Sequence, residues 1–251
     1  MKLTGNTILI TGGTSGIGRA ISEALHDRGN QVIVTGRRQD LLNEVTRTRP
    51  GMVGIRLDVD DPNSLTQLAS HLRENFPKLN VLLVNAGISR SEDIASDIWN
   101  PADAEAIVQT NILGVIRTTS ALLPLVKGQP GATLLATSSS LAFVPRADFP
   151  TYCASKAFLH SWLQSLRHQL RHIPVEVLEL SPPYVQTELT GAHQAHDPRA
   201  MRLADYVAEV LQLLDEGNTP RGEVLLERDL PRRWSEREGS YDAIFAAMNP
   251  S

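Results

Sequence analysis

Short runs of apolar residues alternate along this chain with longer stretches in which apolar positions recur at helical spacing. One run, Val81-Leu82-Leu83-Val84, is uninterrupted, as is typical of parallel strands covered on both faces. Strands are expected at 7–10, 31–35, 52–57, 81–84, 132–136, 175–180 and 223–226. Helices are expected at about 17–28, 38–47, 62–75, 103–126, 153–172 and 203–215. This alternation predicts an α/β fold in which a doubly wound sheet of about seven parallel strands has helices on both faces.

Length and composition indicate one globular domain. The 251 residues are 41% hydrophobic and 21% charged, a balance that argues against disorder. No proline-rich, serine-rich or charged linker divides them, so we expect a single domain across 1–251. Within it we expect a substrate-loop region at about 188–204 and a charged C-terminal tail at about 227–251. The net charge of −4 argues against a large basic surface for nucleic acid.

The use of cysteine and the first residues bear on the cellular compartment. Cys153 is the single cysteine, which excludes an intrachain disulfide and fits a reducing environment. The first residues lack the apolar core of a signal peptide. No run of about 18 apolar residues predicts a membrane span. We therefore expect a cytoplasmic protein with no membrane partner.

A glycine-rich turn follows the first expected strand and opens the first helix, with the spacing Gly12-x-x-x-Gly16-x-Gly18. Glycines let the backbone approach a pyrophosphate, and the helix N-terminus offers free N–H groups and a positive dipole. A turn without a ligand is the alternative, but its place between strand and helix favours a dinucleotide site. The candidate contacts are Gly12, Thr14, Ser15, Gly16, Ile17 and Gly18.

The end of the second expected strand bears on which nicotinamide cofactor binds. NAD sites usually carry an acid there for the ribose 2′-hydroxyl, whereas this chain has Gly36-Arg37-Arg38 and no acid before Asp40. Guanidinium groups suit a 2′-phosphate. A pair of solvated arginines at a helix start is the alternative. We expect NADP(H), with NAD(H) less favoured and Arg37 the more important contact.

Two further strand ends lie where a cofactor should bind. Asp58-Val59 follows the third strand, where the carboxylate could accept from the adenine amino group and Val59 could pack on the ring. A plain helix cap before Pro62 is the alternative reading of Asp58. Asn85-Ala86-Gly87 ends the fourth strand, and its small residues would let the backbone pass close to the cofactor. Both positions are at the carboxyl ends of strands, where ligands bind in such sheets.

A tyrosine and a lysine share one face near the start of a long expected helix. Tyr152 and Lys156 are four residues apart, so the ammonium would favour the phenolate and let the tyrosine exchange a proton with a substrate oxygen. Ser139 would donate to the same oxygen, and Asn111 could hold a water in line with Lys156. Taken singly, each residue has a structural alternative. Their order after the glycine turn indicates nicotinamide-dependent interconversion of a carbonyl and an alcohol.

These motifs together resemble the short-chain dehydrogenase/reductase family over nearly the whole chain. Ser139 stands thirteen residues before Tyr152, the usual interval in that family. The resemblance implies a Rossmann-type fold and a catalytic tetrad of Asn111, Ser139, Tyr152 and Lys156. Tyr152 and Lys156 would also contact the cofactor. The resemblance further implies nicotinamide contacts in the stretch Pro182-Pro183-Tyr184-Val185-Gln186-Thr187, from Pro182, Val185 and Thr187, and it marks Arg37 as typical of NADP(H) users.

A closer resemblance is to the DltE-like branch of these oxidoreductases, on the segments at 79–82, 152–157, 166–170 and 182–183. That branch has no settled substrate. Two departures from the wider family matter. Pro183 replaces a glycine, which could change the nicotinamide geometry. The C-terminal end lacks the glycine-rich strand and loop that support tetramers, so we expect a homodimer through the two long helices.

Weaker signals leave rival readings open. His193 and His196 are three apart, but no acid or cysteine accompanies them, so we expect a polar loop and no metal site. Arg232-Arg233 is interpreted as a solvated pair, and an apolar pattern at 241–248 as a last helix docked on the body. The short polar segment after Thr187 indicates a modest-sized carbonyl or alcohol substrate. The rival functions are a dinucleotide sensor without catalysis and a scaffold.

Overall fold

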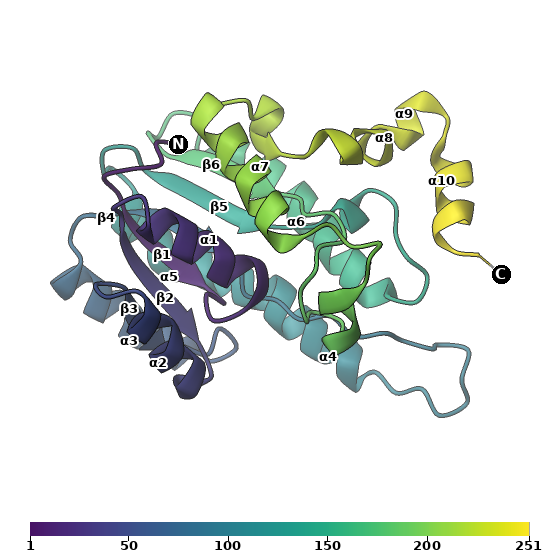
Figure 1. Cartoon of the computed structure of the whole chain (residues 1–251), viewed down its shortest axis with the longest axis horizontal. Helices are drawn as coiled ribbons and strands as arrows, with labels where there is room; N and C mark the ends of the chain where they lie inside the picture. The colour runs from purple at the N-terminus through teal and green to yellow at the C-terminus, as the bar shows by residue number, and fades with distance from the viewer. Residues whose placement is uncertain (251) are drawn as a thin grey trace.

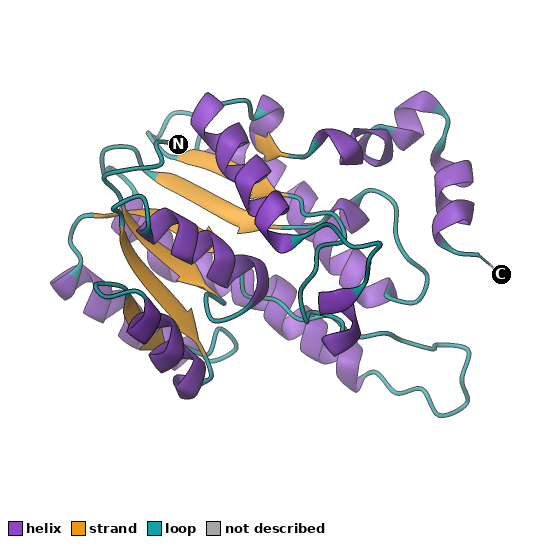
Figure 2. Cartoon of the chain, viewed as in Figure 1, coloured by secondary structure: helices purple, strands orange, loops and turns teal. Residues whose placement is uncertain are grey.

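The computed structural model describes residues 1–250, and its centre is a seven-stranded sheet in the order β3-β2-β1-β4-β5-β6-β7. Every strand pair is parallel. The strands are β1 (Thr7–Thr11), β2 (Gln31–Gly36), β3 (Val53–Arg56), β4 (Leu79–Val84), β5 (Thr133–Thr137), β6 (Glu176–Leu180) and β7 (Glu223–Val224). The expected doubly wound α/β sheet is confirmed, with helices around it as Figure 2 shows.

The helices lie on both faces of the sheet. One face is covered by α1 (Gly16–His26), α2 (Gln39–Thr48) and α7 (Leu203–Glu216), and the other by α3 (Pro62–Asn75), α5 (Val115–Val126) and α6 (Pro150–Gln169). The helix α3 starts where the sequence marks it, because the Asp61 side chain accepts from Asn63 N at 2.9 Å and Pro62 occupies the first helical position.

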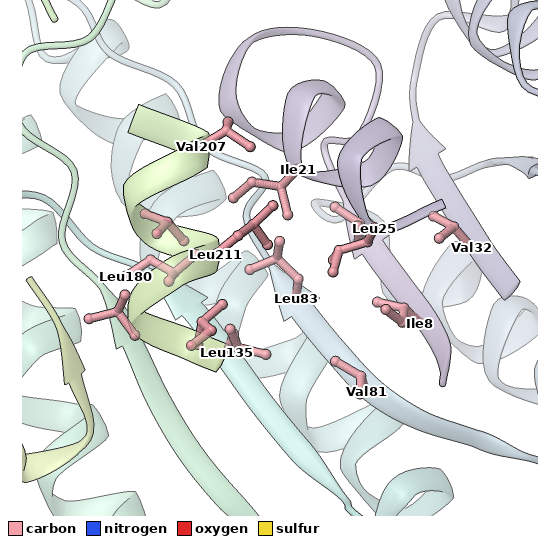
Figure 3. Close-up of a cluster of buried hydrophobic side chains, with 14 of the residues drawn as sticks. Ile8, Ile21, Leu25, Val32, Val81, Leu83, Leu135, Leu180, Val207 and Leu211 are labelled. Atoms are coloured by element: carbon pink, nitrogen blue, oxygen red, sulfur yellow. The ribbon is translucent and has the colours of Figure 1, made fainter. Parts of the chain in front are cut away.

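A hydrophobic core fills the space between the sheet and each helical layer. Figure 3 shows side chains from α1 and α7, such as Ile21 and Leu211, pointing at side chains of the central strands, such as Leu83 and Leu135. All four are at most 3% exposed. Fully burying side chains of this size stabilises a fold by about 1.5–3 kcal/mol each. The layers therefore hold the strand ends in fixed positions, and the candidate site is built from those ends.

A long helical unit before β5 changes its winding midway. It consists of α4 (Ala102–Val108), the π-helical turn η1 (Gln109–Gly114) and α5. Ala102–Val126 is long and apolar enough to span a membrane by length and composition. It is a core helix here, because α5 packs against β4 and α3 and buries Val115, Leu122 and Val126. The π turn is the local feature of interest, since such bulges occur often at functional sites.

The C-terminal region differs from expectation. It comprises the 3₁₀ turns η4 (Pro220–Gly222) and η5 (Glu227–Asp229) and the helices α8 (Leu230–Arg233), α9 (Ser235–Glu238) and α10 (Tyr241–Met248). The expected docking of the last helix is wrong: no residue of α10 is buried, and in Figure 1 this yellow segment stands apart from the sheet. The Asn249 side chain ties it to the loop before α6, by accepting from Ala147 N and donating to Pro145 O.

Candidate functional site

The glycine turn lies at the point where the strand order reverses, between β1 and β4. Gly12 has φ +66°, and a Cβ there would stand 2.9 Å from Ala86 Cα in the segment after β4. A Cβ on Gly18 would collide with the Gly12 carbonyl oxygen and the Asn85 amide. Glycine is therefore required at both positions by packing. In sheets of this kind, ligands bind in the crevice at such a switch point.

The first turn of α1 is suited to an anion. Its N-cap residue, Ser15, is exposed and makes no side-chain capping bond, and no acid stands in the first turn. The first N–H groups of an α-helix have no partner within the helix. They point along a positive dipole into the same turn, so this cradle fits a pyrophosphate.

Both arginines after β2 lie next to this cradle. Gly36 packs against Thr14, since a Cβ on Gly36 would stand 2.9 Å from Thr14 Cγ2. Arg37 and Arg38 follow, are exposed, and form no ion pair or side-chain hydrogen bond among residues 1–250. Their guanidinium groups are therefore free for an anionic group bound beside the glycine turn.

The end of β3 excludes the alternative that Asp58 is the cap of the next helix. Asp61, not Asp58, caps α3. Asp58 Oδ1 accepts from Asp60 N at 3.1 Å in a tight local turn, and the residue is half-buried. Val59 is 8% exposed and packs on Gly114 of the π turn. The adenine contacts of Asp58 and Val59 stay a prediction, and Val59 provides an apolar side chain for the ring at this strand end.

Asn85 joins three segments at the end of β4. Its side-chain amide donates to the carbonyls of Thr11 and Gly12, both at 3.3 Å, and its oxygen accepts from Thr137 Oγ1 at 3.1 Å. Ala86 N donates to Thr11 Oγ1. The sequence indicated small residues that let a cofactor approach, whereas the structure adds that Asn85 fixes the glycine turn to the ends of β4 and β5.

The expected catalytic residues come together at this same edge. Tyr152 and Lys156 lie in the first two turns of α6, and Ser139 follows β5; all three are at most 7% exposed. Lys156 Nζ lies 5.5 Å from the centroid of the Tyr152 ring and donates to Thr137 O at 2.8 Å. A Cβ on Gly87 would stand 3.6 Å from Lys156 Nζ. The lysine is thus held between β5, Tyr152 and the segment after β4.

Ser139 has its hydroxyl proton available. It caps the 3₁₀ turn η2 (Ser140–Ala142), where its oxygen accepts from Leu141 N at 3.1 Å. The next backbone N–H, that of Ser140, donates to Pro182 O at 2.9 Å, which fixes this loop to the end of β6. A hydroxyl that already accepts a bond in the loop is oriented to donate outward.

Asn111 acts here through the elements that it joins. It is fully buried in the π turn, where its Oδ1 accepts from Ile88 N and its Nδ2 donates to Ile88 O and to Ser155 Oγ. The side chain thereby ties the segment after β4 to α6, one residue before Lys156. The role of Asn111 in holding a water in line with Lys156 stays a prediction.

Burial dominates the proton affinities of the pair. Burial raises the pKa of Tyr152, and Ser139 lowers it only in part. Burial lowers the pKa of Lys156 to about 8, against the opposing influence of Glu179. The free protein therefore holds Tyr152 as a phenol at neutral pH, the form that can give a proton. The expected lowering of the tyrosine pKa by the lysine does not prevail here.

The stretch after β6 brings Thr187 to the glycine turn. A Cβ on Gly16 would stand 3.5 Å from Thr187 Cβ. Gln194, which the sequence did not single out, is 4% exposed; its amide donates to Val185 O at 2.7 Å and to Thr187 Oγ1 at 3.1 Å. Two of the three expected nicotinamide contacts, Val185 and Thr187, are thus linked through one buried glutamine in η3 (Ala192–His196). Pro182 is buried and Pro183 is half-buried beside them.

Glu92 is a second residue that the sequence did not indicate. It is 9% exposed, and its carboxylate accepts from Thr151 N and Thr151 Oγ1, both at 3.0 Å. A carboxylate at a helix N-terminus is stabilising, so Glu92 fixes the start of α6 immediately before Tyr152. It also lines a hollow of about 360 Å³ on the loop between β4 and α4, with Trp99 and Asp103 among its other walls.

The structure also places two weaker features of the sequence. His193 and His196 lie in η3, and residues 1–250 hold no cluster of three or more His, Cys, Asp and Glu side chains suited to a metal. The reading of Arg232 and Arg233 as a solvated pair is wrong. Arg232 donates to Ser140 Oγ at 2.6 Å, and Arg233 forms a two-pronged ion pair with Glu223.

Comparison with known proteins identifies relatives over nearly the whole chain. The family model described as short chain dehydrogenase matches residues 6–198. The chain is 36% identical over 255 residues to "Uncharacterized oxidoreductase DltE" of Bacillus subtilis, covering 99% of this chain and 98% of that relative. It is 33% identical over 197 residues to "Sulfoacetaldehyde reductase 2" of Chromohalobacter salexigens, covering 77% and 78%.

Solved structures share the fold. A short chain dehydrogenase from Burkholderia cenocepacia in complex with NADP superposes with a TM-score of 0.83 at 23% identity, covering 98% of this chain and 99% of that one. A short chain dehydrogenase/reductase from Burkholderia phymatum in complex with NAD gives 0.81 at 22% identity, covering 100% and 98%. At this identity the likeness supports the fold, and both nicotinamide cofactors occur among such structures.

Proposed function

This chain belongs to the short-chain dehydrogenase family of oxidoreductases, and from that premise we propose that it is NADP(H)-dependent and interconverts a carbonyl compound and its alcohol. The observation that carries the proposal is the convergence of Ser139, Tyr152 and Lys156, all buried, at the switch point beside the glycine cradle. Packing requires glycine there, and the first turn of α1 offers free N–H groups, so the cradle fits a dinucleotide.

The roles of the side chains follow from their hydrogen bonds. A bound nicotinamide supplies or accepts the hydride at the carbonyl carbon. In reduction, Tyr152 gives its phenolic proton to the substrate oxygen, for which burial keeps it protonated. Ser139 donates its hydroxyl proton to the same oxygen and stabilises the developing charge. Lys156, held by Thr137 O, places a positive charge beside Tyr152 as the phenolate forms.

The preference for NADP(H) is supported by the free guanidinium groups beside Gly36. Arg37→Glu is expected to weaken NADPH binding about ten- to a hundredfold, because charged hydrogen bonds contribute about 1.5–3 kcal/mol each and the new carboxylate repels a 2′-phosphate. NADH binding should stay the same or improve. Isothermal titration with both nucleotides measures this.

The matched control is Arg47→Glu, which makes the same charge change on an exposed residue at the far end of α2. It should leave both affinities unchanged. If Arg37→Glu still prefers NADPH as strongly as the natural chain does, the assignment to NADP(H) is wrong.

A modest-sized carbonyl substrate is supported by the walls around Tyr152. Ile88, Leu141 and Phe149 are partly buried and pack against the cluster that contains Tyr152. These side chains make the surroundings of Tyr152 largely apolar. A relative at 33% identity is described as a sulfoacetaldehyde reductase, which adds a small aldehyde to the compounds worth testing first.

A homodimer through the long helices is supported by their outer surface. Val108, Leu113 and Phe158 lie on α4, η1 and α6 and are 36–39% exposed, although all three are large and apolar. Phe158→Glu is expected to convert the dimer to monomer, as measured by light scattering after size exclusion. Phe245→Glu is the matched control, since Phe245 has the same exposure on α10. Dissociation by the control alone would place the interface at the C-terminal helix instead.

A further inference from the structure

A carboxylate is completely buried in the sheet behind the candidate site. Glu179 of β6 has no exposed surface, and its neighbours in register are Ala136 of β5 and Glu223 of β7. Burying a charge is unfavourable unless partners compensate it. Glu179 has them: its carboxylate accepts from Ser138 Oγ, from Ser181 Oγ and from the His160 ring.

The His160 ring is oriented to donate to this carboxylate. Gln164 Nε2 lies 3.0 Å from His160 Nε2, and an amide nitrogen can only donate, so Nε2 is the acceptor and Nδ1 carries the proton. Nδ1 lies 2.9 Å from Glu179 Oε2. The edge of the ring packs against Phe143 with centroids 5.0 Å apart. The ring is thus fixed on both sides by α6 and by the loop after β5.

The pair touches both segments that carry the proposed catalytic group. His160 is one turn beyond Lys156 and two turns beyond Tyr152 on α6, so the three share one face of the helix. Ser138, which donates to Glu179, immediately precedes Ser139, and its backbone N–H donates to Leu180 O. Any movement of Glu179 would therefore shift the serine loop and the tyrosine-lysine face relative to each other.

We propose that Glu179 and His160 are positioning residues for this group: they fix the Ser138–Ser139 loop against α6, and they hold a buried carboxylate in the strand on which the Tyr152–Lys156 face of α6 packs. This rests on the function proposed above. Burial alone would raise the pKa of Glu179, but the His160 ring and the hydroxyls of Ser138 and Ser181 bring it below its ordinary value, so the carboxylate stays ionised. That charge raises the pKa of Lys156 against the dominant effect of burial.

The charged groups of neighbouring elements are mostly paired with other partners. The titratable groups that face Glu179 are Lys156, His160 and Arg167 from α6, Glu223 from β7 and Arg233 from α8. Glu223 is already neutralised by its two-pronged pair with Arg233, at 2.8 and 2.9 Å. Arg167 donates to the carbonyls of Val177 and Gly222. Glu179 is thus the buried carboxylate whose charge acts on Lys156.

The chain makes a direct test practical, because it contains only four lysines: Lys2, Lys78, Lys127 and Lys156. With lysine labelled with carbon-13 at Cε, NMR follows each amine through its own titration, and Lys156 is identified by its loss in Lys156→Met. In Glu179→Gln, the titration midpoint of Lys156 is expected to fall by about one pH unit or more. Glu223→Gln, which removes the neighbouring buried carboxylate, should leave it unchanged. An unchanged midpoint in Glu179→Gln, or an equal fall in both variants, would overturn the charge role.

A second variant tests the same effect in case Glu179→Gln does not fold. The double change Glu179→Ala with His160→Leu removes both members of the pair and leaves neither unpaired. It should lower the Lys156 midpoint to the same extent. Ser138→Ala keeps the charge but loses one bond to the loop, so it should lower kcat for carbonyl reduction with the Lys156 midpoint intact. A kcat equal to that of the natural chain would overturn the positioning of Ser139.

The pH profile separates this inference from the proposed function. If protonated Lys156 is needed, the alkaline limb of kcat/KM for reduction in Glu179→Gln should move to lower pH by the same amount as the NMR midpoint. If the natural chain is active, but neither the alkaline limb of kcat/KM nor the Lys156 midpoint moves in Glu179→Gln, the inference is overturned and the proposed function stands. A natural chain that reduces no carbonyl would overturn the function, and the lysine titration would still decide whether Glu179 sets the charge of Lys156.

Discussion

Tyr152→Phe is expected to lower kcat for carbonyl reduction roughly a thousandfold, because it removes the single phenolic proton that the site can give to the substrate oxygen. The ring itself should stay in place, since Tyr152 is 7% exposed and packs with Ile107 and Cys153. NADPH affinity and the thermal midpoint should therefore change little. Steady-state kinetics, nucleotide titration and thermal unfolding measure the three quantities on one preparation.

The matched control is Tyr241→Phe, the same change on α10, which stands away from the site. It should retain full activity. A Tyr152→Phe variant that keeps more than about a tenth of the natural kcat would be inconsistent with general acid catalysis by this residue, whose loss typically costs a hundredfold or more.

Gly18→Ala is expected to weaken both the fold and cofactor binding. The added Cβ would collide with the Gly12 carbonyl and the Asn85 amide, which belong to backbone and to a side chain already bonded to three segments. We expect the free energy of unfolding to fall by about 1–3 kcal/mol, as for other overpacked sites. Displacing the turn should cost one or more bonds to the pyrophosphate and weaken NADPH binding about ten- to a hundredfold.

Helix propensity would act in the opposite direction, since alanine is favoured over glycine inside a helix by about 1 kcal/mol. A loss of stability would therefore be due to the collision. Gly54→Ala is the control, because its Cβ would meet side-chain atoms of Thr46 and Leu42 at 3.1–3.5 Å instead of backbone. NADPH affinity in Gly54→Ala should equal that of the natural chain. Natural NADPH affinity in Gly18→Ala would show that the turn does not carry the pyrophosphate.

The fold was predictable because its signals are local. Each of the seven predicted strands is present, and every end agrees within two residues, most of them within one. The larger differences have physical reasons. The strand expected at 223–226 stops at Val224 because the chain turns into η5. The strand expected at 81–84 starts at Leu79, since Asn80 is buried by hydrogen bonds to Asn6 and Pro130 despite its polarity.

The glycine turn and the tyrosine-lysine pair were also predictable, because their spacing alone puts their members together. The supporting residues were not. Glu92 meets Thr151 across 59 residues, and Arg232 meets Ser140 across 92. In the sequence, Glu179 is only a polar residue within an apolar strand, and its contact with His160 is visible only in the structure. Such pairs depend on how helices dock on the sheet, which no local pattern encodes.

The most direct test of the central claim is hydride transfer itself. The natural chain is incubated with NADPH deuterated at C4 of the nicotinamide ring and with a panel of small aldehydes and ketones, and the products are analysed by mass spectrometry. We predict an alcohol that carries deuterium on its carbinol carbon, formed in proportion to NADPH consumed. Tight NADPH binding with no labelled alcohol from any carbonyl in the panel would contradict the claim and favour a dinucleotide sensor on the same fold.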